Sequence, residues 1–427
     1  MDKLLEQLRR IWNSPDIRKN ILFILAMLTL VRVLAHVPIP GVDIASLRVL
    51  LERNQFLGLL NVFTGGTISN FSVVALGVGP YITASIIIQL LTMVVPRLEG
   101  IQKEGEQGQN RLNAYMRYLT VPLAVLQGWS MIALLRQSSH DLRIDVSPLP
   151  LVSMLAIMTA GTMFLMWLGE LITERKMGNG VSLIIFAGII AGLPKYLAQA
   201  AVVFDAGQVI TIALFAIIAV LTIAGVVTIT EGQRNIPVTY AKRIRGMQLV
   251  GGVDTHLPLR VNAAGVIPII FAISVILFPQ ILAQLFANAK TPQIAEVAGW
   301  LLATMHNQIF YGVFYFLLVV GFTFFYTAIV FQPTRVAENL QKQGGFIPGI
   351  RPGTPTVNYL NYVVNRVTLA GAIFLGVIAV LPLALQQFTG TQALVVGGTS
   401  LLIVVSVVIE TIKQIESHLT MREYELG

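Results

Sequence analysis

The chain has 427 residues, of which 55% are hydrophobic and only 12% are charged, and its formal net charge is +8. A soluble domain carries about 25% charged residues, and the mean hydropathy here is +0.75. This composition excludes a water-soluble globule and predicts a membrane protein with several spans. The chain has no cysteine, which excludes disulfides, thiol chemistry and thiolate metal sites.

Apolar runs of about 20 residues, the length that crosses roughly 30 Å of hydrocarbon, recur along the sequence. The fold class predicted from them is an all-α polytopic membrane protein with ten transmembrane helices. The cores of the ten spans are expected near residues 21–37, 71–95, 115–135, 150–172, 181–200, 208–230, 262–286, 308–331, 367–386 and 393–414. Ten spans divide into five and five, and an inverted repeat is a natural architecture for a membrane passage. We therefore expect an N-terminal half (21–200) and a C-terminal half (208–414).

The basic residues orient these spans. Most of the 29 Lys and Arg residues fall on segments that share one side of the membrane, so the positive-inside rule predicts that both termini are cytoplasmic. These are the segment 1–20 and the tail 415–427. Two cytoplasmic loops, about 231–260 and 332–366, exceed the usual connector length. We expect them to form a working surface, although loops that only connect spans remain the alternative.

Residues 56–95 hold too much apolar sequence for one helix, and glycines and a proline interrupt the run. Pro80 cannot donate a backbone hydrogen bond and favours the first turn of a helix, so a spanning helix is expected to restart near it. The stretch of about 57–70 is too short to span and too apolar for water. Non-helical backbone at membrane depth needs shielding by protein or a water-filled cavity, which predicts a pore or an ordinary re-entrant packing segment.

The fifth span is also unusual, because only thirteen residues separate Val181 from Leu193 before Pro194. A helix of that length is about 20 Å long. We expect it to be shielded by protein, to extend past Pro194, or to lie beside a thinned passage. The turn Gly178-Asn179-Gly180 precedes it.

The first long loop contains RNIPVTYAKRIRG, residues 234–246. Alternation of Ile236, Val238 and Tyr240 with polar or small neighbours predicts a short strand. Arg243 and Arg245 follow it. They form either a solvated cluster that orients the protein or a docking surface for an acidic or RNA partner.

The second long loop contains GGFIPGIRPGTPT, residues 344–356. Its glycines and prolines exclude a helix and predict an ordered, protruding loop. Arg351 lies near the tip. Composition alone allows it to be merely solvated, but the constraint on the loop favours a functional role.

Known catalytic motifs are absent from the sequence: there is no HExxH, no GxxxxGK[ST] and no GxSxG. We expect no catalytic residue, metal or cofactor. Acidic residues that could couple transport to protons, namely Glu170, Glu231 and Glu410, fall near the cytoplasmic ends of their spans. This argues against a solute transporter with its own substrate site, which is the alternative function, and an intramembrane enzyme lacks any motif.

Several stretches, in order along nearly the whole chain, resemble the SecY family of protein-conducting channels. They are IPGVD (39–43, preceded by Pro38), FTGGTISNFSVVALGVGPYITASIIIQLLT (63–92), GTMFLMWLGELITERKMGNGVSLIIFAGIIAGLP (161–194), THLPLRVNAAGVIPIIFA (255–272), FYTAIVFQPTRVAENLQKQGGFIPGIRPGTPT (325–356) and GGTSLLIVVSVVIE (397–410). The resemblance implies two pseudo-symmetric five-helix halves around an hourglass pore, in the bacterial plasma membrane.

The resemblance also assigns residues to a seal and a plug. The pore ring would consist of six aliphatic positions: Val78, Ile82, Val181, Ile185, Ile270 and Ile403. Taken singly, each would be read as ordinary packing or lipid contact. The segment of about 57–70 would be a short plug helix that includes Asn61, Phe63, Gly65 and Gly66.

The resemblance also implies a lateral gate and a set of partners. Thr83 and Ser274 match positions in a gate that opens towards lipid. Arg351, Arg243 and Arg245 match the surface that docks a SecA motor ATPase or a translating ribosome. The resemblance further implies small SecE-like and SecG-like membrane subunits, with signal peptides and nascent chains as substrates. The channel itself would be passive.

Overall fold

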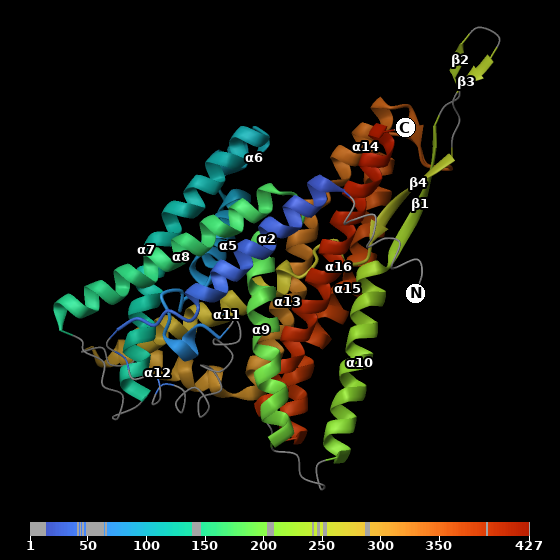
Figure 1. Ribbon diagram of the computed structural model, residues 1–427. Helices are drawn as coiled ribbons and strands as arrows, with labels where there is room; N and C mark the ends of the chain where they lie inside the picture. Colours follow the sequence, from blue (N-terminus) through green and yellow to red (C-terminus); the bar gives the residue numbers. More distant parts are fainter. Residues whose placement is uncertain are drawn as a thin grey trace.

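The protein is mainly helical, as predicted, and its helices gather into one bundle with a β-hairpin projecting from one end (Figure 1). The computed structural model describes residues 14–40, 42, 44, 47, 64, 66–138, 147–202, 209–240, 243–245, 248–250, 254–286, 291–389 and 392–426.

A helix falls within each of the five predicted spans of the N-terminal half. The elements of this half are α2 (Pro15–Leu34), the 3-10 turn η1 (Ile68–Asn70), α5 (Gly79–Val94), α6 (Pro96–Lys103), α7 (Glu106–Ser138), α8 (Pro148–Glu174) and α9 (Gly180–Val202). Helix α9 runs through Pro194, so the short fifth span is extended. Asn179 caps it, because its side-chain oxygen accepts from the backbone N–H of Val181 and Ser182 at 3.1 and 3.3 Å.

The C-terminal half likewise places a helix over each of its predicted spans. Its elements are α10 (Val209–Glu231), β1 (Gln233–Tyr240), β2 (Arg243–Arg245), β3 (Gln248–Val250), β4 (Asp254–Arg260), α11 (Ile267–Phe286), α12 (Pro292–His306), α13 (Gln308–Val330), α14 (Pro333–Lys342), β5 (Gly345–Phe346), α15 (Thr354–Thr389) and α16 (Gln392–Leu426). Helices α6, α12 and α14 lie in segments that were expected to be loops.

Length and apolar composition qualify fewer helices as membrane-crossing. Within the described residues, three stretches pass: 148–174, 308–342 and 354–381. A fourth passes if α5 and α6, which are bent by 102°, count as one span. Three shorter apolar helices lie at 180–192, 216–231 and 267–280. The helical class is confirmed, and the number of ten crossings stays a prediction.

Helix α5 begins at Gly79, with Pro80 in its first turn, as the sequence predicted. The first part of the expected second span is instead non-helical: residues 71–78 form turns, with Ser72 in an isolated bridge to Pro38. Phe71, Ser72, Val74 and Ala75 have no exposed surface, so protein shields this irregular backbone as membrane depth requires. Phe71 has a left-handed φ of 41°, a conformation that costs a non-glycine residue about 1–2 kcal/mol.

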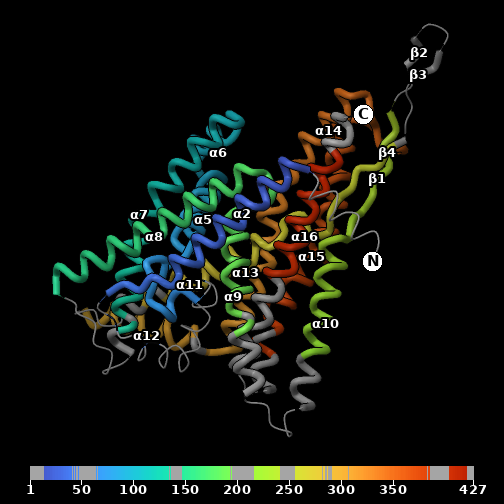
Figure 2. Tube along the Cα trace, viewed as in Figure 1, coloured from blue at the N-terminus to red at the C-terminus, as the bar shows by residue number. Residues whose placement is uncertain are grey.

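Helix packing brings the two halves together. Helix α2 packs against α8 and α9; it runs alongside α8 and crosses α9 (Figure 2). Helix α11 packs against α5 and α7, and α16 packs against α9 as well as α10 and α15. Helices α11 and α16 of the C-terminal half therefore contact helices of the N-terminal half, and the main apolar cluster draws residues from both.

A small sheet adds to the all-α class. Strand β1 pairs antiparallel with β4, with Ile236 opposite Leu257, so the predicted short strand is part of a hairpin. Strand β5 pairs with the other edge of β1, with Tyr240 opposite Gly345. The two long loops are therefore joined by backbone pairing, which local sequence did not predict because the pairing is between residues far apart in the chain.

Candidate functional site

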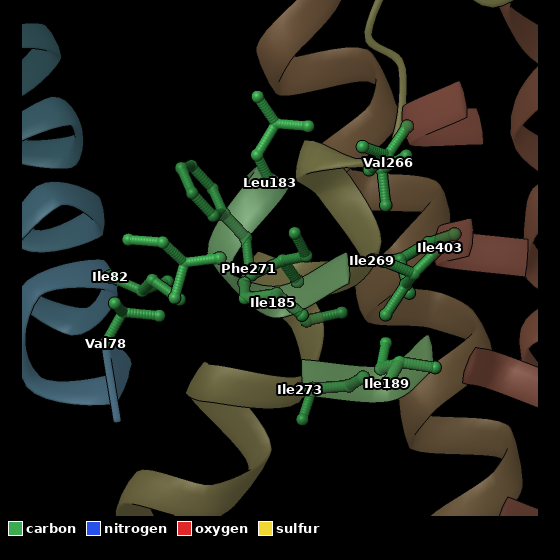
Figure 3. Packing of buried hydrophobic residues seen from close by; sticks show 14 of the residues in the cluster. Val78, Ile82, Leu183, Ile185, Ile189, Val266, Ile269, Phe271, Ile273 and Ile403 are labelled. Atoms are coloured by element: carbon green, nitrogen blue, oxygen red, sulfur yellow. The ribbon is translucent and has the colours of Figure 1, made fainter. Parts of the chain in front are cut away.

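The six aliphatic residues of the predicted ring share one apolar cluster. Val78, Ile82, Ile185, Ile270 and Ile403 belong to the main apolar cluster, each with 6% or less of its surface exposed, and partly buried Val181 packs against it. They come from five elements: the turn before α5, then α5, α9, α11 and α16. Figure 3 shows side chains from the α5 end pointing towards those of α9 and α11, with Ile403 approaching from α16.

The cluster is larger than the predicted six. It includes Phe271, Ile269 and Leu183, and Phe271 meets Phe322 of α13 edge-on at a centroid distance of 5.9 Å. These residues adjoin predicted ones in the sequence, but nothing in an apolar helix distinguishes the face that meets other helices from the face that meets lipid. Only the packing identifies them.

A cavity of about 610 Å³ lies on one side of the six aliphatic residues; Ile82, Val181 and Ile270 line it. We call it the large cavity. Most of its other lining residues are polar: Ser85, Gln89, Gln109, Asn110, Asn113, Arg117, Glu170, Thr173, Glu174, Lys176, Asn179 and Ser182. This polar lining was not predicted, because its members are spread over four helices, α5, α7, α8 and α9, and the turn before α9.

An ion pair stands at the wall of the large cavity. Arg117 of α7 contacts both carboxylate oxygens of Glu170 of α8, with its Nε at 2.9 Å from Oε1 and a terminal nitrogen at 2.7 Å from Oε2. Such two-point pairs fix geometry as well as charge. Glu231 pairs with Lys413 at 2.9 Å. These two acidic residues, expected near the helix ends, are therefore engaged in ion pairs between helices.

A pocket of about 20 Å³ is lined by the residues one helical turn away from those at the large cavity: Val78 rather than Ile82, and Ile185 rather than Val181. Thr64, Thr67 and Arg32 are among its other lining residues. We call it the small pocket. Of the predicted plug residues, Asn61, Phe63 and Gly65 lie outside the described residues. Gly66 has a positive φ of 80°, a conformation that glycine adopts without steric cost. η1 follows it, and Ser69 Oγ donates to the Gly66 carbonyl at 2.7 Å.

The two predicted gate residues lie on packed helices. Thr83 of α5 is buried and donates to the Gly79 carbonyl, and it accepts a bond from Gln127 of α7 at 3.4 Å. Ser274 of α11 donates to the Ile270 carbonyl at 2.9 Å. Helices α5 and α7 both pack against α11.

The long loops share a separate apolar cluster. Ile236 and Val238 of β1 pack with Leu340 of α14, with Ile347 and with Leu360 of α15. Arg351 is exposed, while its carbonyl accepts a bond from buried Thr356 at 2.9 Å. This hydrogen bond holds the backbone of Arg351, while its side chain faces solvent. Arg243 and Arg245 lie on β2, which pairs with β3.

The fold and the site together define a polytopic helical membrane protein in which aliphatic side chains separate a large polar cavity from a small pocket. The SecY family model matches residues 72–412. Protein translocase subunit SecY of Streptomyces galbus is 45% identical over 442 residues, which cover 99% of this chain and 99% of that protein. The Mycobacterium bovis subunit is 46% identical over 431 residues, covering 96% and 97%.

Solved structures agree at the level of the fold. A protein-conducting channel has a TM-score of 0.63 at 17% identity, over 92% of this chain and 91% of that one. Sec61 in a canine ribosome-channel complex has a TM-score of 0.60 at 17% identity, with the same coverage. The chain belongs to the SecY family.

Proposed function

We propose that this chain is a protein-conducting channel, which moves unfolded, signal-bearing polypeptides across the bacterial plasma membrane and releases apolar segments sideways into lipid. The observation that carries the proposal is the six aliphatic residues between the large cavity and the small pocket. Branched aliphatic side chains offer no hydrogen bonds, so they do not hold a passing chain. They pack closely around it, and a narrow apolar constriction also gates by dewetting.

In this proposal the six residues form the pore ring, and the large cavity is the cytoplasmic entrance. Its volume of about 610 Å³ accommodates a stretch of extended chain, and its amide and hydroxyl groups solvate peptide groups. The segment of about 57–70 is the plug on the outer side. Thr83 and Ser274 lie on the helices that part when the lateral gate opens.

The energy for transport comes from a partner in this proposal. Arg351, with Arg243 and Arg245, docks a SecA motor ATPase or a translating ribosome, and small SecE-like and SecG-like subunits complete the assembly. The similar fold of Sec61 in a ribosome-channel complex and the name of the relatives as translocase subunits support these partners. Both termini are cytoplasmic, in agreement with the distribution of Lys and Arg.

Reconstitution tests the proposal. The chain and its small subunits are placed in vesicles, a SecA-class motor and ATP are added, and protection of a signal-bearing precursor from protease is measured. We expect protection that needs ATP and the signal peptide. A precursor without its signal is the matched control. Absence of signal-dependent import, with uptake of a small solute instead, would favour the transporter alternative.

A further inference from the structure

Val78 is the one member of the proposed ring that precedes its helix. It is the N-cap of α5, with a φ of −92°, and its carbonyl accepts the first helical bond from Ile82 at 3.0 Å. The position of an N-cap side chain depends on the chain that leads into the helix as well as on the helix. The segment 71–78 therefore contributes to the position of Val78 in the seal.

Backbone hydrogen bonds tie this segment to residues before it. The Ile39 N–H donates to the Phe71 carbonyl at 2.8 Å, and the Val73 N–H donates to the Val37 carbonyl at 3.0 Å. Within the segment, the Gly77 N–H donates to the Val74 carbonyl at 2.9 Å. The path into α5 is thus fixed along its length.

Phe71 anchors the start of the segment. Its side chain has no exposed surface and packs in a second apolar cluster, with Ile68, Leu135 and Met158 among its members. Its φ of 41° is rare for a bulky residue. Such a conformation persists only when the surroundings over-determine it, and it often occurs where geometry serves function.

Gly161 of α8 lies directly against the segment 71–78, at Val73. A Cβ built at Gly161 would lie 2.0 Å from the carbonyl oxygen of Val73. No side chain fits there without a shift of the backbone on one side or the other. The wall formed by α8 therefore lies directly against the segment that carries Val78.

We propose that Phe71 and Gly161 are positioning residues of the seal: together they hold the segment 71–78 so that Val78 stays packed against the other aliphatic residues. This inference rests on the proposed function for its meaning. Its test, however, reads the packing of Val78 directly and needs no transport.

The test uses a thiol reporter, which the absence of native cysteine allows. Val78→Cys is introduced into the full chain, reconstituted with its small subunits, and the rate of modification by a water-soluble maleimide is measured. The buried position, 5% exposed, predicts slow modification. Adding Gly161→Ala should raise the rate severalfold.

Gly321→Ala on α13 is the matched control, because nothing lies within 4 Å of a Cβ built at Gly321. It should leave the rate unchanged. Phe71→Leu supplies a second variant that keeps an apolar side chain, and it should raise the rate by a smaller factor. If Gly161→Ala does not assemble, the Phe71→Leu result decides.

The inference would be overturned if an assembled Gly161→Ala protein and the control were modified at equal rates. If Gly161→Ala does not assemble, an unchanged rate in Phe71→Leu would overturn it. A lower thermal unfolding midpoint without faster modification would do the same, because it would indicate a merely structural role. If the unsubstituted protein failed to import the precursor, the proposed function would be wrong. The effect of Gly161→Ala on the modification rate at Val78→Cys would still test the positioning role, because that measurement does not depend on import.

Discussion

The six aliphatic residues and the loop that carries Arg351 are both supported by apolar clusters, yet they present opposite chemistry. The aliphatic residues, five of them buried and Val181 partly buried, come from five elements and carry no charge. The loop exposes one guanidinium on a backbone held by Thr356 and by the packing of Ile347. A seal formed by six similar side chains should weaken gradually as each one is changed. A property that depends on one exposed charge is lost with that charge.

The largest expected effect therefore belongs to Arg351. We predict that Arg351→Glu reduces motor-driven import to background, because charge reversal at a docking surface replaces attraction by repulsion. Folding should persist, since a surface substitution usually changes stability by about 0.5 kcal/mol or less. ATP-driven import and the amount of assembled protein in the vesicles are measured together. Lys103→Glu, a charge reversal on exposed α6, is the control, and normal import by Arg351→Glu would refute the docking role.

The next largest effect concerns polarity in the seal. Ile403→Asn should wet the constriction and raise the ion conductance of the closed channel, and it should let defective signal sequences through. A buried amide without a partner also costs about 1–3 kcal/mol of stability. Planar-bilayer recordings test the leak, with Ile403→Leu as the apolar control. A conductance equal to that of the control would show that apolar character at this position does not maintain the seal.

A smaller effect is expected for a change of size alone. Ile185→Val removes one methylene from a side chain that is 3% exposed, and such changes cost about 0.5–1.5 kcal/mol. The other five residues should still close most of the gap, so the leak should rise only slightly. The same recordings measure it. A leak as large as that of Ile403→Asn would contradict the idea that the seal is shared.

The smallest effect is expected at the wall of the large cavity. Arg117→Ala removes the ion pair with Glu170. The side chain of Arg117 is 51% exposed and that of Glu170 is 22% exposed. Exposed pairs contribute about 0–1 kcal/mol, so thermal unfolding should change little and import should slow modestly. Arg117→Lys keeps the charge but not the two-point geometry. If Arg117→Ala abolished import, a single charge would matter inside the channel as much as on the loop.

Much of the fold followed from local sequence. Apolar runs placed helices over all ten predicted spans, and Pro80 marked the start of α5, because a proline suits a first helical turn wherever the chain goes. The period-two pattern around Ile236 indicated β1. Helices α6, α12 and α14 were not anticipated, because short helices between spans lack a long apolar run.

The candidate site was predictable only through resemblance. Val78, Ile82 and Ile403 look like any membrane aliphatic, and periodicity does not separate a face that meets a seal from one that meets lipid. The amides and hydroxyls of the large cavity, such as Gln89 and Asn113, gave no signal, because they come together only when α5 and α7 pack.

The sequence by itself determined that this is a polytopic helical membrane protein with an interrupted second span and two constrained loops, because hydropathy, charge and proline act over neighbouring residues. The tertiary structure decided which aliphatic side chains meet, which polar groups line one side of them, and how segment 71–78 is held. Those depend on contacts between residues far apart in the chain, as between Gly161 and Val73, and on close packing that leaves each backbone few alternative positions.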